Sequence, residues 1–287
     1  MTEAVSKGHI VIDHVGVRFG RNATAVDAVT DVSMEVRPGE FVSIIGPSGC
    51  GKSTLLNVVA GFVNPTRGTA TLDGKPVEKP GADRGMVFQQ YSLFPWMTVR
   101  KNVEFGLKMQ GMGITQREEA ARTLLGLAGL LSFENHYPDQ LSGGMKQRVG
   151  IVRALATSPQ VLLMDEPFGA LDAQTRVVMQ EILTNMWQRF RISVLFITHD
   201  IEESIFLSDR ILVMTARPGR IKAEIVVPLP RPRTPGMIGT PEFGALVQQL
   251  RALIREESLA AMGGELKEGG LGGFDVEVGP KGVAELV

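Results

Sequence analysis

The sequence predicts an α/β fold with an antiparallel β-subdomain at its N-terminal end and an inserted α-helical subdomain. Three observations predict it. A short apolar strand, a glycine-rich loop and a helix follow one another over residues 40–60. Residues 98–157 carry apolar side chains at helical spacing. Two later apolar runs, at 161–164 and 193–197, end in polar residues, as buried strands do where they reach the ligand-binding edge of a parallel sheet.

Composition and charge are those of an ordinary globular protein. Hydrophobic residues make up 44% of the 287 residues and charged residues 21%, which is enough for a sizeable core. The formal net charge of −1 shows no basic surplus, so we expect no nucleic-acid partner. The single cysteine, Cys50, cannot form an internal disulfide and indicates a reducing compartment. We expect neither a signal peptide nor a membrane span, so work at a membrane would need another chain.

The β-rich part covers residues 9–45. Val32, Met34 and Val36 alternate with polar residues, which predicts a strand with one buried face. An earlier strand ends at Phe19. An aromatic ring at a strand end either stacks on a base such as adenine or packs into the core, and the local sequence leaves both open.

The most specific motif is the loop at 46–54, which matches G-x-x-x-x-G-K-[ST] at every position. Its residues are Gly46, Pro47, Ser48, Gly49, Cys50, Gly51, Lys52, Ser53 and Thr54. The glycines let successive backbone N–H groups and the helix N-terminus point at one anion. We expect Lys52 to reach the β- and γ-phosphates and Ser53 to hold Mg²⁺. A glycine turn that binds nothing is the alternative, but Lys-Ser between a strand and a helix favours nucleoside triphosphate binding.

Polar residues follow the remaining predicted strands. Gln89 ends a short strand near 86–87, where its amide can accept a hydrogen bond from a Mg²⁺-bound or attacking water. Asp165 suits a Mg²⁺ contact, and Glu166 is placed to polarise the attacking water. A solvated acidic turn is the alternative for this pair. His199 ends the strand at 193–198 and is a candidate for contact with the γ-phosphate.

The helical segment contains a second candidate anion site. Thr115–Glu118 fits a capping box that would begin one helix. Ser142 is expected to cap another helix, with Gly143 and Gly144 behind it, and a serine and two glycines at a helix N-terminus can bind an anion. Asp172 is expected to cap the helix that follows the acidic pair. The chain thus offers two phosphate-binding helix starts far apart in the sequence.

The C-terminal part is less informative. Prolines between 228 and 235 predict a stiff linker, and Thr240–Glu257 is expected to form one last helix. Glycine pairs beyond Ala261 predict a mobile tail over 262–287. No internal repeat is visible.

Taken together, these motifs resemble the ATP-binding subunits of ATP-binding cassette (ABC) transporters. The matching segments are the Walker A loop at 46–54, the Q-loop glutamine Gln89, the signature LSGGM at 141–145, the Walker B strand at 161–167, the D-loop at 170–172 and the switch histidine His199. The resemblance makes Phe19 the adenine-stacking aromatic. Phe94–Val99, the run at 165–172 and Pro230–Arg233 are similar to the nitrate, sulfonate and taurine importer branch.

The resemblance implies a P-loop NTPase fold with a RecA-like mixed-sheet core. It implies an ABC ATPase domain over 9–230 with a helical subdomain at about 90–157, then a linker and helix over 231–261, and the glycine-rich tail. ATP and Mg²⁺ are the implied cofactors, with Ser53, Gln89 and Asp165 at the metal. The implied catalytic residues are Glu166, His199 and Gln89: Glu166 as general base, His199 as the sensor of the γ-phosphate, and Gln89 as the link between Mg²⁺ and the permease.

The implied partners are a second copy of the chain, a membrane permease and, through it, a periplasmic or lipoprotein solute-binding protein. The two copies pair head-to-tail, so that Ser142, Gly143, Gly144 and Asp172 of one copy meet the nucleotide held by the other. This places the chain on the cytoplasmic face of the inner membrane as a peripheral subunit. The alternatives are half of an exporter, an ABC ATPase of DNA repair or translation, and a P-loop kinase; the last leaves LSGGM unexplained. The sequence does not identify the solute.

Overall fold

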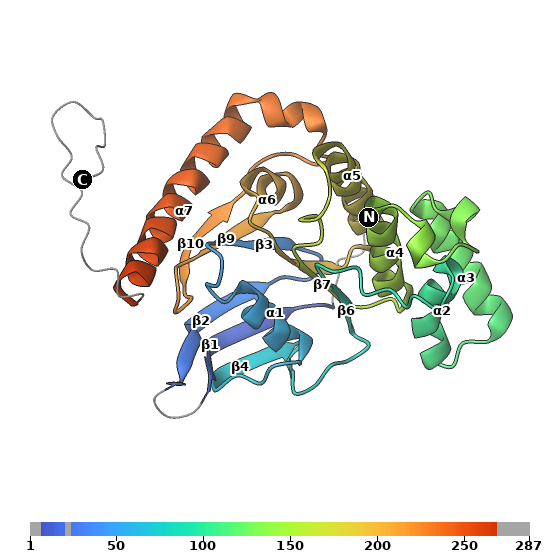
Figure 1. Cartoon of the computed structure of the whole chain (residues 1–287), viewed down its shortest axis with the longest axis horizontal. Coiled ribbons are helices and arrows are strands. Elements are labelled where there is room, and N and C mark those ends of the chain that lie inside the picture. Colours follow the sequence, from blue (N-terminus) through green and yellow to red (C-terminus); the bar gives the residue numbers. More distant parts are fainter. Residues whose placement is uncertain (1–6, 21–23, 269–287) are drawn as a thin grey trace.

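The computed structural model describes residues 7–20 and 24–268, with side chains up to 261. Two sheets and the helices around them form the structure (Figure 1). The mixed α/β architecture predicted from the sequence is confirmed.

The larger sheet has six strands in the order β10-β9-β3-β8-β7-β6. β3, β6, β7, β8 and β9 run parallel and β10 pairs antiparallel with β9. The strands are β3 (Phe41–Ile45), β6 (Arg84–Val87), β7 (Val161–Asp165), β8 (Ser193–Ile197), β9 (Arg210–Met214) and β10 (Ile221–Val226). Every residue of β3 is buried, as its central position requires.

The smaller sheet is antiparallel and comes from the N-terminal part, as predicted. Its order is β2-β1-β4-β5, with β1 (Ile10–Phe19), β2 (Val26–Val36), β4 (Arg67–Leu72) and β5 (Lys75–Pro76). Val32 and Val36 are buried on β2 while Ser33 between them is exposed, so the alternation in the sequence does mark the buried face.

The helices are α1 (Lys52–Ala60), α2 (Val99–Met109), α3 (Ile114–Leu127), α4 (Gly143–Ala156), α5 (Ala173–Phe190), α6 (Ile201–Leu207) and α7 (Pro241–Glu268), with single 3-10 turns at 131–133, 138–140 and 235–239. The predicted helical insertion comprises α2, α3 and α4, which lie together at one end of the molecule (Figure 1). The capping box predicted at Thr115–Glu118 is wrong. Helix α3 begins at Ile114, so its N-cap is Gly113, two residues before Thr115, and no side chain caps it.

The central strand β3 divides the hydrophobic core in two. Val42 and Ile44 face one cluster, formed with α1 and the antiparallel sheet. Phe41 and Ile45 face the other cluster, formed with the helical insertion and helices α5, α6 and α7. The period-2 alternation of a strand therefore fixes the P-loop, which follows β3, between the two halves of the molecule.

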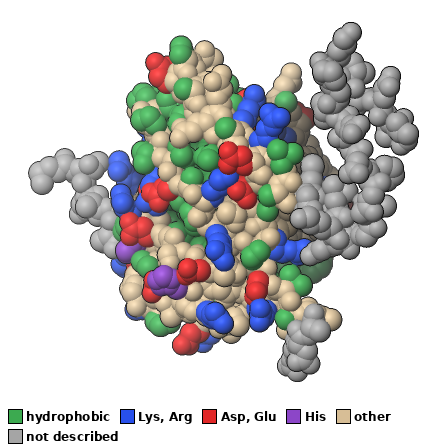
Figure 2. All heavy atoms as spheres, turned by 90° about the vertical axis from the view of Figure 1, so that its left-hand side faces the viewer, with side chains coloured by type: hydrophobic (Ala, Val, Ile, Leu, Met, Phe, Trp, Pro, Cys, Tyr) green, Lys and Arg blue, Asp and Glu red, His purple; other side chains and the backbone are tan. Residues whose placement is uncertain are grey.

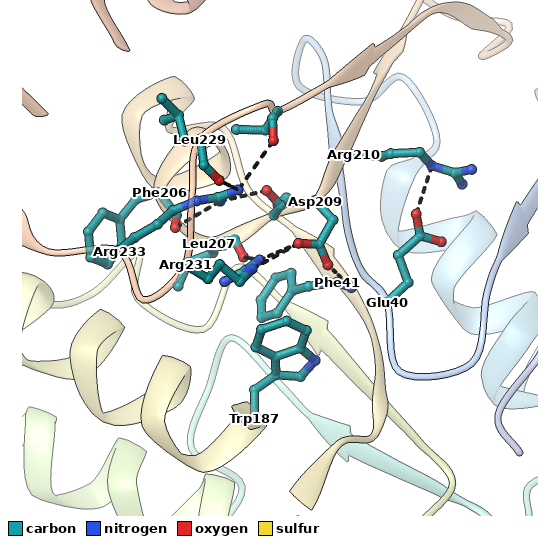
Figure 3. Close-up of polar contacts among 12 residues, drawn as sticks. Glu40, Phe41, Trp187, Phe206, Leu207, Asp209, Arg210, Leu229, Arg231 and Arg233 are labelled. Carbon is teal, nitrogen blue, oxygen red and sulfur yellow. Dashed lines mark hydrogen bonds and ion pairs between the residues drawn. The ribbon is translucent and has the colours of Figure 1, made fainter. Parts of the chain in front are cut away.

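The C-terminal segment is more firmly attached than a linker (Figure 3). Arg233 is buried and donates hydrogen bonds to the carbonyls of Ile205, Phe206 and Ser208 at the end of α6. The guanidinium of Arg231 lies 4.1 Å from the ring centre of Trp187 and donates to the Asp209 carboxylate. This proline–arginine strap, residues 228–235, binds α6 to the core.

Helix α7 is longer than predicted. It begins at Pro241 and continues to Glu268, past the predicted end at Glu257 and into the segment assigned to the glycine-rich tail. The rest of that predicted tail, 269–287, lies outside the described residues. In the described ranges, no helix combines the length and apolar character needed to cross a bilayer. The face drawn in Figure 2 mixes acidic and basic side chains, and neither sign dominates its described part.

Candidate nucleotide site

The loop at 46–54 has the backbone that phosphate binding requires. It joins the buried strand β3 to α1, and Gly51 occupies the N-cap of that helix with φ 103°. A Cβ at Gly51 would lie 2.6 Å from Val29 Cγ1 and 2.7 Å from the Ala28 carbonyl oxygen, so only glycine fits. No side chain caps α1, which leaves its first N–H groups directed at the loop mouth.

Lys52 is held inside this loop. Its side chain is buried, and its ammonium donates hydrogen bonds of 2.9 Å to the carbonyls of Gly46 and Pro47. These bonds keep a positive charge where the loop would bind an anion. Cys50 is buried beside it, and burial raises the pKa of its thiol, so this thiol is not activated for redox chemistry.

A cavity of about 430 Å³ opens over the loop. Its lining residues are Phe19, Val26, Ala28, Ser48, Gly49, Gly51, Lys52, Ser53, Thr54, Glu166 and Arg217. The side chain of Phe19 is 48% exposed and faces this cavity, so it is not a core residue. An aromatic ring, a phosphate loop and a carboxylate thus share one cavity, which suits a nucleotide.

Two of the three predicted metal ligands are adjacent. Ser53 Oγ donates a 3.0 Å hydrogen bond to Asp165 Oδ1. Burial raises the pKa of Asp165, and the Ser53 hydroxyl counteracts it. A hydroxyl and a carboxylate whose charge is poorly solvated form a donor set that fits Mg²⁺. Gln89, the third predicted ligand, forms its side-chain hydrogen bond with Glu166 and not with Ser53 or Asp165.

Gln89, Glu166 and His199 lie together instead. Gln89 Nε2 donates to Glu166 Oε2 at 3.4 Å, and His199 Nδ1 lies 3.2 Å from the same oxygen. Glu166 has φ 42°, in the left-handed region, and its N–H donates to the Ile197 carbonyl of the neighbouring strand. Backbone strain at a residue that three strand ends surround is typical of a functional site. The three residues predicted as catalytic therefore converge on one carboxylate.

The signature segment lies elsewhere. Ser142 caps α4 by accepting a hydrogen bond from the N–H of Met145, as predicted, and Gly143 and Gly144 form the first turn of that helix. Asp172 caps α5 through the N–H of Thr175, also as predicted. None of these residues lines the cavity over the P-loop in the described part of the chain. The second anion site is thus separate from the first within one copy.

Sequence reasoning missed two features of the site. Arg217 lines the cavity from the loop between β9 and β10, where the sequence indicated only a turn. Glu203 is buried on α6, where its Oε1 atom accepts a 3.3 Å hydrogen bond from Gln180 Nε2, and burial raises its pKa to about 7. Both positions depend on contacts between distant segments, and the sequence around them carries no motif.

Comparisons with known proteins found a matching family model, similar sequences and similar structures. The family model described as "ABC transporter" matches residues 29–169. The nitrate import ATP-binding protein NrtD of Synechocystis sp. is 49% identical over 253 residues, which cover 86% of this chain and 95% of that protein. The taurine import ATP-binding protein TauB of Rhizobium johnstonii is 48% identical, with 85% and 95% covered. A dimeric ATP-binding cassette solved in a post-hydrolysis state with ADP and Pi has a TM-score of 0.68 and 33% identity, over 76% of this chain and 98% of that one.

Proposed function

Because the chain belongs to the ATP-binding subunits of ABC transporters, we propose that it hydrolyses ATP to drive import of a small anion such as nitrate, taurine or another sulfonate. The observation that carries the proposal is the convergence of Gln89 and His199 on Glu166, at the cavity that the P-loop lines. The names of the similar nitrate and taurine import proteins support the choice of solute class.

In this proposal the P-loop holds the triphosphate and Phe19 stacks on adenine. Lys52 turns its ammonium toward the β- and γ-phosphates, where charge grows as the terminal bond breaks. Glu166 accepts a proton from the attacking water, whose oxygen bonds to the γ-phosphorus while the bond to ADP breaks. His199 fixes the Glu166 carboxylate through its Oε2 atom, and Gln89 contacts the same atom until Mg²⁺ binds.

Ser53 and Asp165 would hold Mg²⁺, and Gln89 would join them by turning from Glu166. The ion would neutralise charge on the phosphate oxygens. The 3.0 Å contact between Ser53 and Asp165 supports this assignment.

Two copies would form the working unit. The signature residues Ser142, Gly143 and Gly144 and the D-loop residue Asp172 lie outside the cavity of their own copy, so a head-to-tail pair would bring them to the partner's nucleotide. The solved dimeric cassette with ADP and Pi supports the pairing of two copies. A permease would hold the pair at the cytoplasmic face of the inner membrane, and a solute-binding protein would deliver the anion.

Transport in vesicles tests the proposal. The chain would be purified with the membrane proteins that accompany it and reconstituted with ATP inside the vesicles. Uptake of nitrate or taurine that requires ATP, and that Glu166→Gln abolishes, is the expected result. Recovery with ribosomal or DNA-repair proteins in place of a permease would overturn the importer role and leave the ATPase intact.

A further inference from the structure

The loop between β9 and β10 carries a cation that no motif accounts for. Arg217 lines the nucleotide cavity together with Phe19 and Lys52, and its side chain is exposed. Within the described residues its guanidinium makes no hydrogen bond or ion pair. Lys52, by contrast, already donates to two carbonyls of the P-loop. Arg217 is therefore the cation of this cavity whose donors are open to a ligand.

The loop is fixed against the nucleotide site. The N–H of Gly219 donates to the Ala28 carbonyl at 3.0 Å, and the Gly219 carbonyl accepts from Thr30 at 2.9 Å, so the loop pairs with β2. A Cβ at Gly219 would overlap the carbonyl oxygen of Cys50. The loop backbone thus packs directly on the P-loop. Because Arg217 lies two residues before Gly219, its backbone is held in a fixed position beside the cavity.

The other side of this loop is held by helix α7, which runs beside β9 and β10 (Figure 1). Glu257 Oε2 accepts a 2.8 Å hydrogen bond from the N–H of Ala216, the residue before Arg217. The second oxygen of Glu257 lies 2.7 Å from the ammonium of Lys222 on β10. With its side chain only 13% exposed, Glu257 is a fixed link between α7 and the loop.

We propose that Arg217 binds the phosphates of the bound nucleotide and that Glu257, as a positioning residue, holds Arg217 in place. This rests on the proposed function, because it takes the cavity to be the ATP site. A guanidinium presents five N–H donors in a fork that matches phosphate oxygens, and an ATP anion with several charges accommodates a second cation beside Lys52. The C-terminal helix thereby becomes part of the nucleotide site.

Affinity for ADP tests the first half, because ADP binds without turnover. Arg217→Ala is expected to raise the Kd for ADP about tenfold, the usual effect of a charge-assisted hydrogen bond. Arg217→Lys is expected to restore part of the affinity, and the difference between Arg217→Ala and the wild type is expected to shrink at high salt. An unchanged Kd in Arg217→Ala overturns the inference. A wild type that binds no ADP would instead overturn the proposed function.

Two adjacent glutamates test the second half. Glu256 and Glu257 both pair with Lys222, but only Glu257 reaches Ala216. Glu257→Ala is expected to raise the Kd for ADP, and the KM for ATP, about threefold to fivefold while kcat stays the same. Glu256→Ala is the matched control and is expected to leave both constants unchanged. Glu257→Gln keeps an acceptor for the Ala216 N–H and is expected to bind ADP almost as the wild type does.

A double-mutant cycle separates positioning from general damage. If Glu257 acts through Arg217, Glu257→Ala has no further effect on the Kd for ADP in an Arg217→Ala background. Additive effects of the two substitutions, or an equal loss of affinity in Glu256→Ala, would overturn the positioning role.

Discussion

At the scale of single residues, the proposed hydrolysis depends on one carboxylate. Glu166 has two partners on its Oε2 atom and a left-handed backbone conformation. Its other oxygen makes no hydrogen bond among the described residues and is left for water. This arrangement suits a general base whose orientation is set by the ends of neighbouring strands.

Glu166→Gln is the first prediction at this scale. The amide keeps the shape but cannot accept a proton, so kcat for ATP hydrolysis should fall by about 10²–10⁴-fold while the Kd for ATP changes little. Steady-state phosphate release and equilibrium binding measure the two quantities. Turnover at the wild-type rate would exclude Glu166 as the base.

Glu203 gives a pH-dependent prediction. Burial raises its pKa to about 7 from an ordinary 4.5, and the groups around it are Thr198, Gln180, Asp200 and Arg176. The native state therefore keeps a proton that the unfolded chain loses above pH 4.5. The contribution of this group to the free energy of unfolding is fully present below pH 4.5 and is lost as the pH rises to 7.

Glu203→Gln removes this titration. The measured quantity is the free energy of unfolding of Glu203→Gln minus that of the wild type. This difference should rise by up to about 3 kcal/mol between pH 4.5 and pH 7 and should stay constant above pH 7. Urea unfolding of both proteins at a series of pH values measures the difference. A difference that does not vary with pH would show that Glu203 is ionised in the native protein.

At the scale of elements, a part of the fold could be predicted when the residues that determine it lie close together in the sequence. The P-loop, the caps at Ser142 and Asp172, and the strand at 161–165 were predicted because each is determined by residues a few positions apart. The strap at 228–235 was taken for a linker because its partners lie more than 20 residues earlier on α6. The prolines indicate only that the backbone is stiff locally. The contacts of Arg231 and Arg233 depend on the fold and are not visible in the local sequence.

A prediction about stability concerns Arg233 in this strap. It donates to three carbonyls around the end of α6, and a helix leaves its last carbonyls without partners. Arg233→Ala would leave these buried carbonyl oxygens without hydrogen-bond donors, which should lower the free energy of unfolding by about 2–3 kcal/mol. Arg251→Ala, an arginine on α7 whose ion pair with Glu202 is exposed, is the control and should cost less than about 0.5 kcal/mol. Equal losses in both variants would show that the strap carries no special stability.

At the scale of the whole molecule, the proposed mechanism uses the two anion sites of two different copies of the chain. The cavity over the P-loop is lined by residues of the N-terminal sheet and of loops that follow strands of the larger sheet, whereas Ser142 belongs to the helical insertion. The motifs alone indicate both sites but not their distance in space, which the order of motifs along a chain does not fix; their separation is predicted only by the family resemblance.

ATP-dependent dimerisation is the prediction at this scale. Glu166→Gln should hold ATP without cleaving it, so the 31.1 kDa chain should elute as a dimer in the presence of ATP and as a monomer without it. Adding Ser142→Arg should prevent dimerisation, because a positive side chain would occupy the partner's phosphate site, while each monomer still binds ATP. Thr98→Arg is the control, because it replaces the N-cap residue of α2 as Ser142→Arg replaces that of α4. It should leave the dimer intact. A dimer that survives Ser142→Arg would contradict the head-to-tail arrangement.

The central place of β3 has a consequence for how the chain folds on the ribosome. β3 pairs on its two edges with β8 and β9, and Phe41 lies opposite Val194. Both partners are synthesised after the helical insertion, so an apolar five-residue strand emerges early and waits for residues 193–214. Native contacts of such long range form slowly, and nascent chains that await them expose apolar surface. A strand that is buried at every residue in the finished protein is thus expected to stay exposed during synthesis until β8 and β9 have been made.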